Sequence, residues 1–78
     1  MSKMDTLADL KIGESAIIVA FTDEEMGLKL MEMGCIPGEI IKLERVAPMG
    51  DPIAVSVSGY VMSLRKAEAA TITITGRF

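Results

Sequence analysis

The sulfur-containing side chains within residues 30–38, LMEMGCIPG, form the densest group of potential metal ligands in this 78-residue sequence. Met31, Met33 and the only cysteine, Cys35, lie within five positions. Thiolate and thioether sulfurs are soft ligands, so this spacing could hold Cu(I). The competing interpretation is core packing, since methionine fills irregular gaps and a free cysteine behaves as a small apolar residue. No Cys-x-x-Cys pattern supports the metal, and we therefore expect packing, with no bound metal or cofactor.

Catalytic groups are sparse as well. The sequence has no histidine, which removes the commonest general base and the commonest metal ligand. Glu24 and Glu25 stand side by side, but such a pair is typical of the start of a helix, where carboxylates face the positive end of the helix dipole. Residues 50–52, Gly-Asp-Pro, lack the GxxxxGK[ST] pattern of a phosphate-binding loop and read as a turn. We expect no enzymatic activity.

Charge and composition argue against several further classes of protein. The net charge is −3, and the densest basic spot is Arg65-Lys66, which argues against nucleic-acid binding because that function usually needs a basic stripe. A single cysteine cannot form the disulfides of a small secreted domain. The N-terminus resembles no signal peptide, and the longest apolar run, residues 16–21, is too short to span a membrane. We expect one cytoplasmic domain over residues 1–78 without membrane insertion.

The hydrophobic pattern predicts a mostly β, small α+β fold. Strands are expected at residues 15–21, 39–46, 53–58, 60–64 and 71–75, with one helix over 23–33 and short helical turns near residues 7–10 and 65–70. The side chains expected to face the core are Leu7, Leu10, Ile41, Leu43, Ile53, Val55, Val57, Tyr60, Met62, Leu64, Ile72 and Ile74. A small antiparallel sheet leaves reactive edges unless it closes, so we expect a closed barrel with the helix plugging one end and residues 76–78 as a tail.

The helix ends are marked by local signals. Thr22 is expected to cap the helix, with Glu25 completing a capping box. Gly27 inside the helix is unfavourable by about 1 kcal/mol relative to alanine. Gly34 is expected to end the helix in a left-handed conformation, which would place Cys35 against Leu30. Pro37-Gly38 then fits the middle of a type II turn leading into the second strand.

Several stretches together resemble one family. They are a helix exit with Leu30, Met33, Gly34, Pro37 and Gly38; a loop with Gly50, Asp51 and Pro52; a strand start at Gly59 and Tyr60; and a turn with Leu64, Arg65, Glu68 and Ala69. In this order they cover nearly the whole chain and resemble FeoA, the ferrous iron transport protein A of bacteria. The resemblance implies an SH3-like five-stranded β-barrel with one α-helix inserted after the first strand.

The resemblance also implies a function. FeoA-like proteins are not regarded as enzymes, and the family assists FeoB, the membrane Fe(II) transporter with a GTPase domain. We expect this chain to be a stand-alone accessory protein that contacts such a transporter through protein surfaces. We expect the contact surface on the inserted helix and in the cleft beside it, because an insertion is where a common barrel can be made particular. The candidate contact residues are Met26, Lys29, Met49, Arg65 and Lys66. Self-association through a sheet edge is compatible with this role.

The alternative is a barrel of the same shape that binds nucleic acid or another protein and has no part in iron uptake. A salt titration separates the nucleic-acid possibility, because such binding weakens steeply as salt rises.

Overall fold

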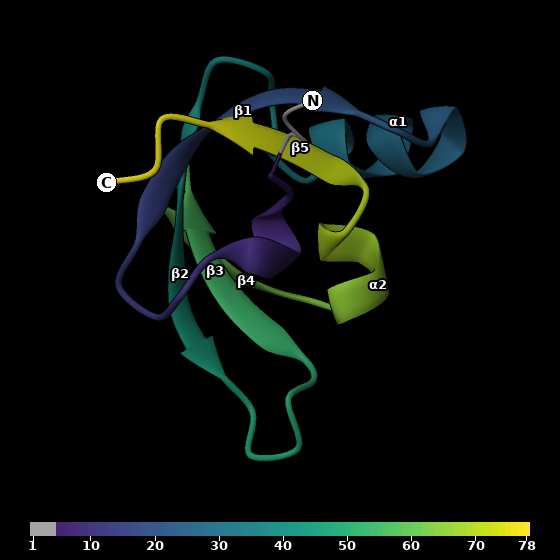
Figure 1. Ribbon diagram of the computed structural model, residues 1–78. Helices are drawn as coiled ribbons and strands as arrows, with labels where there is room; N and C mark the ends of the chain where they lie inside the picture. The colour runs from purple at the N-terminus through teal and green to yellow at the C-terminus, as the bar shows by residue number, and fades with distance from the viewer. Residues whose placement is uncertain (1–4) are drawn as a thin grey trace.

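Five antiparallel strands form one curled sheet in a computed structural model that describes residues 5–78 (Figure 1). The elements follow the order η1 (Leu7–Asp9), β1 (Ser15–Phe21), α1 (Glu24–Glu32), β2 (Ile40–Val46), β3 (Ile53–Val57), β4 (Tyr60–Leu64), α2 (Lys66–Ala69) and β5 (Ile72–Thr75). The predicted fold class is confirmed: the chain is mostly β, with one α-helix between its first two strands. None of the helices in this part of the chain has the length and apolar character needed to cross a bilayer.

The sheet does not close into a barrel, contrary to our expectation. Its strand order is β4-β3-β2-β1-β5, so β4 and β5 are both edges. The outer side of β5 is taken by the N-terminal segment, where Thr6 bridges to Thr73 and the Ile74 N–H donates to the Asp5 carbonyl at 3.0 Å. The short helices η1 and α2 pack together beside β5 (Figure 1). A closed barrel would require β4 to pair with the free edge of β5. The N-terminal segment forms hydrogen bonds with that edge and covers it, so β4 cannot pair there.

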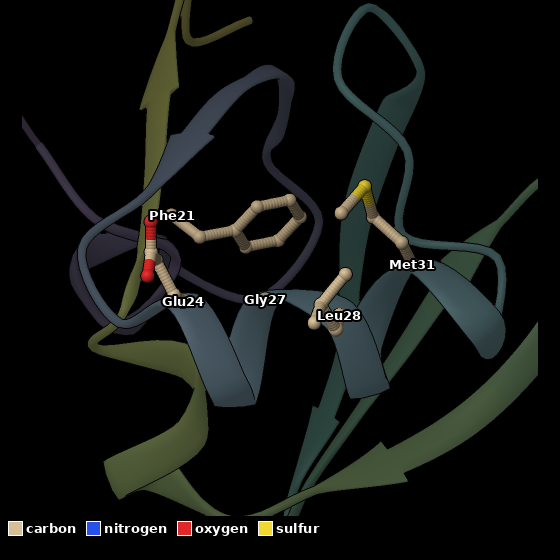
Figure 2. Close-up of a pocket in the computed structure, with 5 residues that line it drawn as sticks. All are labelled: Phe21, Glu24, Gly27, Leu28 and Met31. Carbon is tan, nitrogen blue, oxygen red and sulfur yellow. The ribbon is translucent and has the colours of Figure 1, made fainter.

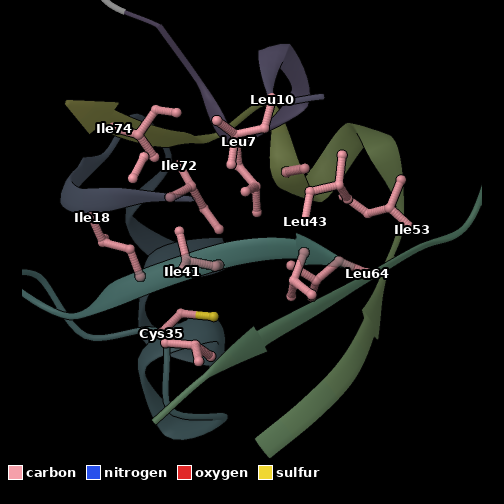
Figure 3. Close-up of a cluster of buried hydrophobic side chains, with 14 of the residues drawn as sticks. Leu7, Leu10, Ile18, Cys35, Ile41, Leu43, Ile53, Leu64, Ile72 and Ile74 are labelled. Atoms are coloured by element: carbon pink, nitrogen blue, oxygen red, sulfur yellow. The ribbon is translucent and has the colours of Figure 1, made fainter. Parts of the chain in front are cut away.

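The core is built almost entirely from aliphatic side chains (Figure 3). The residues expected to face inward are buried in η1, β2, β3 and β5, and so is Leu64 of β4. Met62 is half-buried and packs against this cluster. Tyr60 is the exception, with 69% of its surface exposed, because it lies next to the β3–β4 turn at the end of an edge strand. The alternation within β4 is correct, but the core does not extend under its first residue.

A β-bulge in β1 determines where Phe21 points. The pairing register with β5 shifts between Ile18 and Ala20, so that Ile18 lies opposite Ile74 and Phe21 lies opposite Ile72. Directly opposed residues point to the same side of a sheet. Ile72 and Ile74 are both buried, so the extra residue brings Phe21 back to the core side, three residues after Ile18. Strict alternation would have placed Phe21 on the outer face.

Helix α1 begins one residue later than predicted. Its N-cap is Asp23, whose carboxylate accepts a hydrogen bond from the Met26 N–H at 3.1 Å, and Thr22 is not the cap. The physical reason is tertiary: the Thr22 N–H donates to the Thr71 carbonyl at 2.9 Å, which keeps Thr22 with the sheet. Asp23 is then the first residue free to accept from the helix.

The C-terminal end of α1 agrees with the expected glycine cap. Gly34 has φ +108°, its N–H donates to Met31, and the Cys35 N–H donates to the Leu30 carbonyl at 2.9 Å. This pair of bonds is the Schellman arrangement. The expected type II turn follows, since Gly38 has φ +96° and the Glu39 N–H returns to the Ile36 carbonyl at 3.0 Å. The sequence LMEMGCIPG is therefore a helix exit.

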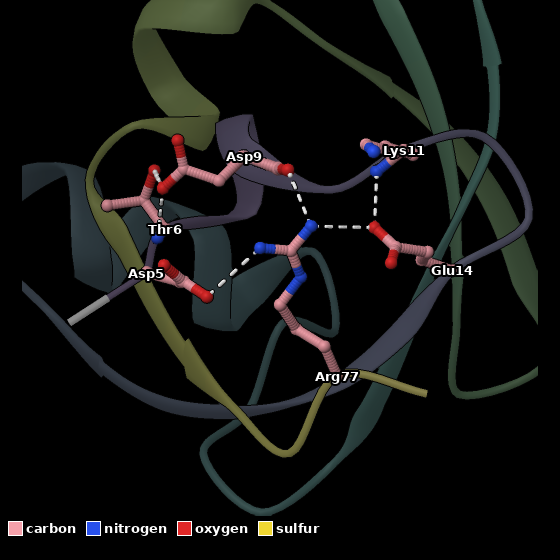
Figure 4. Close-up of polar contacts among 6 residues, drawn as sticks. All are labelled: Asp5, Thr6, Asp9, Lys11, Glu14 and Arg77. Atoms are coloured by element: carbon pink, nitrogen blue, oxygen red, sulfur yellow. Dashed lines mark hydrogen bonds and ion pairs between the residues drawn. The ribbon is translucent and has the colours of Figure 1, made fainter.

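The last three residues do not form a free tail, which corrects another expectation. The backbones of Phe78 and Ser15 exchange hydrogen bonds of 2.8 and 2.7 Å. The Arg77 guanidinium contacts the carboxylate oxygens of Asp5 at 3.1 Å and Glu14 at 2.8 Å (Figure 4). Arg77 lowers the pKa of the Glu14 carboxyl, and the Lys11 N–H reinforces the effect by donating to the same group. The Arg77 side chain thus links Asp5 in the N-terminal segment to Glu14, which directly precedes β1.

Candidate functional site

An apolar groove lies beside helix α1, with a volume of about 380 Å³ (Figure 2). We call it the α1 groove. Its lining residues come from the end of β1 and from two turns of α1, and they are Phe21, Glu24, Gly27, Leu28 and Met31. The Phe21 ring crosses above Gly27 toward Leu28 and Met31 (Figure 2). Leu28 is 63% exposed, so much of its apolar surface meets water at the groove.

The helix can approach Phe21 because residue 27 has no side chain. A Cβ atom at position 27 would lie 2.9 Å from the Phe21 Cβ and 3.0 Å from its Cγ, closer than such atoms pack. The bulge in β1 turns the Phe21 ring toward the helix, and the absence of a side chain at Gly27 leaves space for that ring. The unfavourable glycine in the helix is therefore explained by packing. Together these two features place an apolar floor under the exposed Leu28 and Met31.

One acidic side chain, that of Glu24, lines the α1 groove. Asp23, Glu25 and Glu32 add negative charge to the same helix and its cap. The single basic residue of α1 is Lys29, whose Nζ lies 3.8 Å from a Glu68 carboxylate oxygen on α2. An apolar recess with a negative rim favours a binding segment that has a large apolar side chain next to a lysine or arginine.

The sulfur groups do not converge on one ligand set. Cys35 is fully buried in the core (Figure 3), where its Sγ lies 3.9 Å from the Met62 Sδ, whereas Met31 lines the open α1 groove. Burial raises the pKa of the Cys35 thiol, which keeps it protonated, and only the thiolate is a good metal ligand. The contacts favour the packing interpretation. Within residues 5–78, no three His, Cys, Asp or Glu side chains are grouped as a metal site.

The proposed contact residues fall on two separate parts of the surface. Met26 is half-buried and packs against the core, while Lys29 is exposed on the same helix. Met49, 93% exposed, lies in the β2–β3 loop at the opposite end of the molecule from α1 (Figure 1). Arg65 and Lys66 are exposed at the start of α2.

The Gly-Asp-Pro loop is linked to the basic corner. The Asp51 carboxylate accepts a hydrogen bond from the Lys66 N–H at 2.8 Å, at the first residue of α2. Asp51, Pro52 and Arg65 line another hollow, of about 400 Å³. The loop is therefore a structural support for α2, as well as a turn between strands.

The sequence predicted a contact surface on the inserted helix and in a cleft beside it, but it did not name the residues that line the α1 groove. Leu28 and Met31 have the spacing of residues on one helix face, and that pattern alone does not distinguish a buried face from an exposed one. The one available signal was Gly27, because a glycine in the middle of a helix often permits close approach of another group. Its partner Phe21 could not be named without the bulge in β1.

Comparison with known proteins gives a consistent result. The family model of the FeoA domain matches residues 6–75. An Fe(2+) transport protein A/Fe(2+) transporter FeoB fusion protein of Porphyromonas gingivalis is 33% identical over 69 residues, which is 87% of this chain and 8% of that protein. The chain thus spans less than a tenth of that relative.

Two solved structures have the same fold. The NMR structure of a FeoA-like protein from Clostridium acetobutylicum is 38% identical, with a TM-score of 0.87 over 96% of this chain and 88% of that one. The crystal structure of Stenotrophomonas maltophilia FeoA complexed with zinc, described as a prokaryotic SH3 domain protein, is 26% identical, with a TM-score of 0.80 over 91% and 89%. The curled sheet is therefore SH3-like, and by both sequence and fold the chain belongs to the FeoA domain family.

Proposed function

We propose that this chain is a cytoplasmic accessory protein of ferrous iron transport that binds a FeoB-type transporter through the α1 groove. The observation that carries the proposal is the apolar recess on the helix inserted into the SH3-like sheet, with Leu28 exposed and Phe21 beneath it. Insertions are where a common fold acquires a particular partner. The fusion protein of Porphyromonas gingivalis supports the pairing, since it joins an FeoA-type segment and a FeoB transporter in one chain.

The chemistry of the α1 groove defines what the transporter has to present. The recess has room for one leucine- or phenylalanine-sized side chain, which would cover Leu28 and Met31 and remove their apolar surface from water. A lysine or arginine beside that side chain would meet Glu24 at the rim. Such anchors typically carry most of the binding energy of a small interface.

The other contact residues extend this surface. Lys29 lies on the same helix as the α1 groove and is joined to α2 through Glu68, so Arg65 and Lys66 can take part in a contact that reaches from α1 to α2. Met26 contributes by positioning the helix against the core, since it is half-buried. Met49 would serve a separate contact at the far end of the molecule.

Co-purification with the FeoB-type transporter of the same organism tests the proposal. Tagged wild-type protein is compared with Met26→Glu, Lys29→Glu and Leu28→Glu variants, each first shown to be folded by its circular dichroism. We expect wild-type protein to retain the transporter and Leu28→Glu to lose it. Equal recovery of the transporter with every variant would exclude α1 as the contact.

A role through protein contact also predicts weak metal binding. The purified domain should bind Fe(II) with a dissociation constant well above about 1 μM, because its one thiol is buried and it has no imidazole. Stoichiometric binding at lower concentrations would contradict this role and indicate a carrier.

A further inference from the structure

Strand β4 presents an open backbone edge. Its hairpin with β3 turns through Ser58 and Gly59, whose φ values of +53° and +82° are those of a two-residue type I′ turn. The pair that flanks such a turn, Val57 and Tyr60, is hydrogen-bonded, and hydrogen-bonded pairs then alternate along the hairpin. The N–H and C=O groups of Val61 and Ser63 therefore point away from β3. No hydrogen bond outside the β3–β4 pairing engages either residue in the described part of the chain.

This edge lacks the features that usually prevent strand pairing. Tyr60–Leu64 contains no charged residue and no proline, and its register with β3 is regular. The opposite edge of the sheet differs, because Asp5 and Thr6 cover β5. Val61 is 65% exposed beside the open edge. Of the two sheet edges, β4 is thus the one whose backbone can still pair with a further strand.

We propose that β4 pairs antiparallel with β4 of a second copy of this chain, around a two-fold axis at Met62. The backbone itself is self-complementary in this register. Val61 of each copy lies opposite Ser63 of the other, so the outward groups of the two residues form four inter-chain hydrogen bonds. Tyr60 lies opposite Leu64 of the other copy, and no two like charges face each other within the strand. The two sheets then continue as one.

Charges at the two ends of β4 complement each other in this arrangement. Arg65 follows β4 directly and, in this register, lies opposite Gly59 in the turn of the other copy. Glu39 is held at that turn by the Ser58 hydroxyl, which donates to its carboxylate at 2.8 Å. Each copy thus brings a guanidinium to the acidic turn of its partner, twice per dimer. A parallel or shifted pairing would lose this match, which is why the second copy fits the edge better than an arbitrary strand.

Strand β4 lies three strands away from β1, so the proposal goes beyond the transporter contact, although Arg65 adjoins both surfaces. Measuring self-association of the purified protein without the transporter tests the two proposals separately. Sedimentation equilibrium of the purified protein between about 5 and 500 μM is the direct test, because an interface this small is expected to be weak. We expect wild-type protein to pass from monomer to dimer within this range. Protein that remains monomeric throughout would overturn the proposal and leave the edge to a strand from a different protein.

A matched pair of variants identifies the edge. Val61→Lys places a charge beside the two-fold axis and should raise the dissociation constant at least tenfold, whereas Val61→Thr keeps the β-branched shape and should leave it within a factor of about three. Position 61 is solvent-exposed in the monomer, so both variants should fold. A dimer that tolerates Val61→Lys would place the interface elsewhere and contradict the proposal.

A charge exchange tests the register. Arg65→Glu and Glu39→Arg should each weaken the dimer several-fold, and the double variant Arg65→Glu/Glu39→Arg should recover most of the loss, because the two positions face each other across the two-fold axis. A double variant as weak as the sum of the two single changes would overturn the proposed register.

Discussion

The Phe21 side chain fills the space in which a side chain on Gly27 would lie, because a Cβ atom at position 27 would be 2.9 Å from the Phe21 Cβ. Gly27→Ala is therefore expected to lower the free energy of unfolding by about 1 kcal/mol. Overpacking costs roughly 1–3 kcal/mol, and alanine recovers at most about 1 kcal/mol of helix propensity. Urea denaturation of the two proteins measures the difference.

The same substitution in a Phe21→Ala background is the control. Phe21→Ala removes the ring atoms that lie 3.0 and 3.2 Å from a Cβ at position 27 but keeps the Phe21 Cβ at 2.9 Å. Gly27→Ala should therefore destabilise this background less than it destabilises wild type, because only part of the close contact remains. If Gly27→Ala has the same effect with and without the ring, the two residues are not coupled and the explanation for Gly27 is wrong.

Asp23 is the N-cap of α1, which a second pair of variants can demonstrate. Asp23→Ala should lower the free energy of unfolding by about 1 kcal/mol, because the Met26 N–H loses its hydrogen-bond acceptor. Thr22→Ala is the matched change one residue earlier and should have little effect, since only the backbone of Thr22 is bonded, to Thr71. A larger loss of stability in Thr22→Ala than in Asp23→Ala would show that Thr22 is the N-cap.

The contact of Arg77 with Glu14 predicts a pH-dependent stability. Arg77 holds the pKa of the Glu14 carboxyl below its ordinary value of 4.5, so the ionised form is favoured in the folded protein. The stabilising contribution is present above the unfolded-state pKa and is lost as pH falls through the lower, folded-state pKa. Arg77→Gln should therefore be less stable than wild type at neutral pH, and the two curves should converge in acid. A difference that stays constant with pH would exclude Glu14 as the source.

Cys35 should be protected from thiol reagents. Its side chain is fully buried and burial raises its pKa, so alkylation by iodoacetamide should require local opening of the fold. We expect the native protein to react at least about a hundredfold more slowly than the urea-unfolded chain, since exchange through opening scales with stability. Equal rates would place the thiol at the surface and reopen the soft-metal interpretation of residues 31–35.

The sequence was most informative where structure is decided locally. Gly34 ends α1 and Pro37-Gly38 turns into β2 because positive φ at glycine is a property of the residue itself. Strand positions were predicted for the same reason, since burial of Ile41 and Leu43 follows from alternation along one segment.

The features that could not be predicted from the sequence depend on contacts between segments that are far apart along the chain. The Thr22 backbone is held by Thr71, which moves the helix start by one residue. Asp5 and Thr6 cover the edge of β5, which leaves the sheet open, and Arg77 finds its partners near the other end of the chain. The α1 groove depends on a bulge near Ile18, and a bulge has no reliable signature in a single sequence.

The affinity of the purified FeoB-type transporter for Leu28→Glu and Ile12→Glu variants tests the central claim most directly. Leu28 and Ile12 are matched in exposure, at 63% and 64%, but only Leu28 lines the α1 groove. The account predicts that Leu28→Glu weakens binding at least tenfold, about 1.4 kcal/mol, while Ile12→Glu binds as wild type does. Equal affinities of the two variants would contradict a contact through the α1 groove.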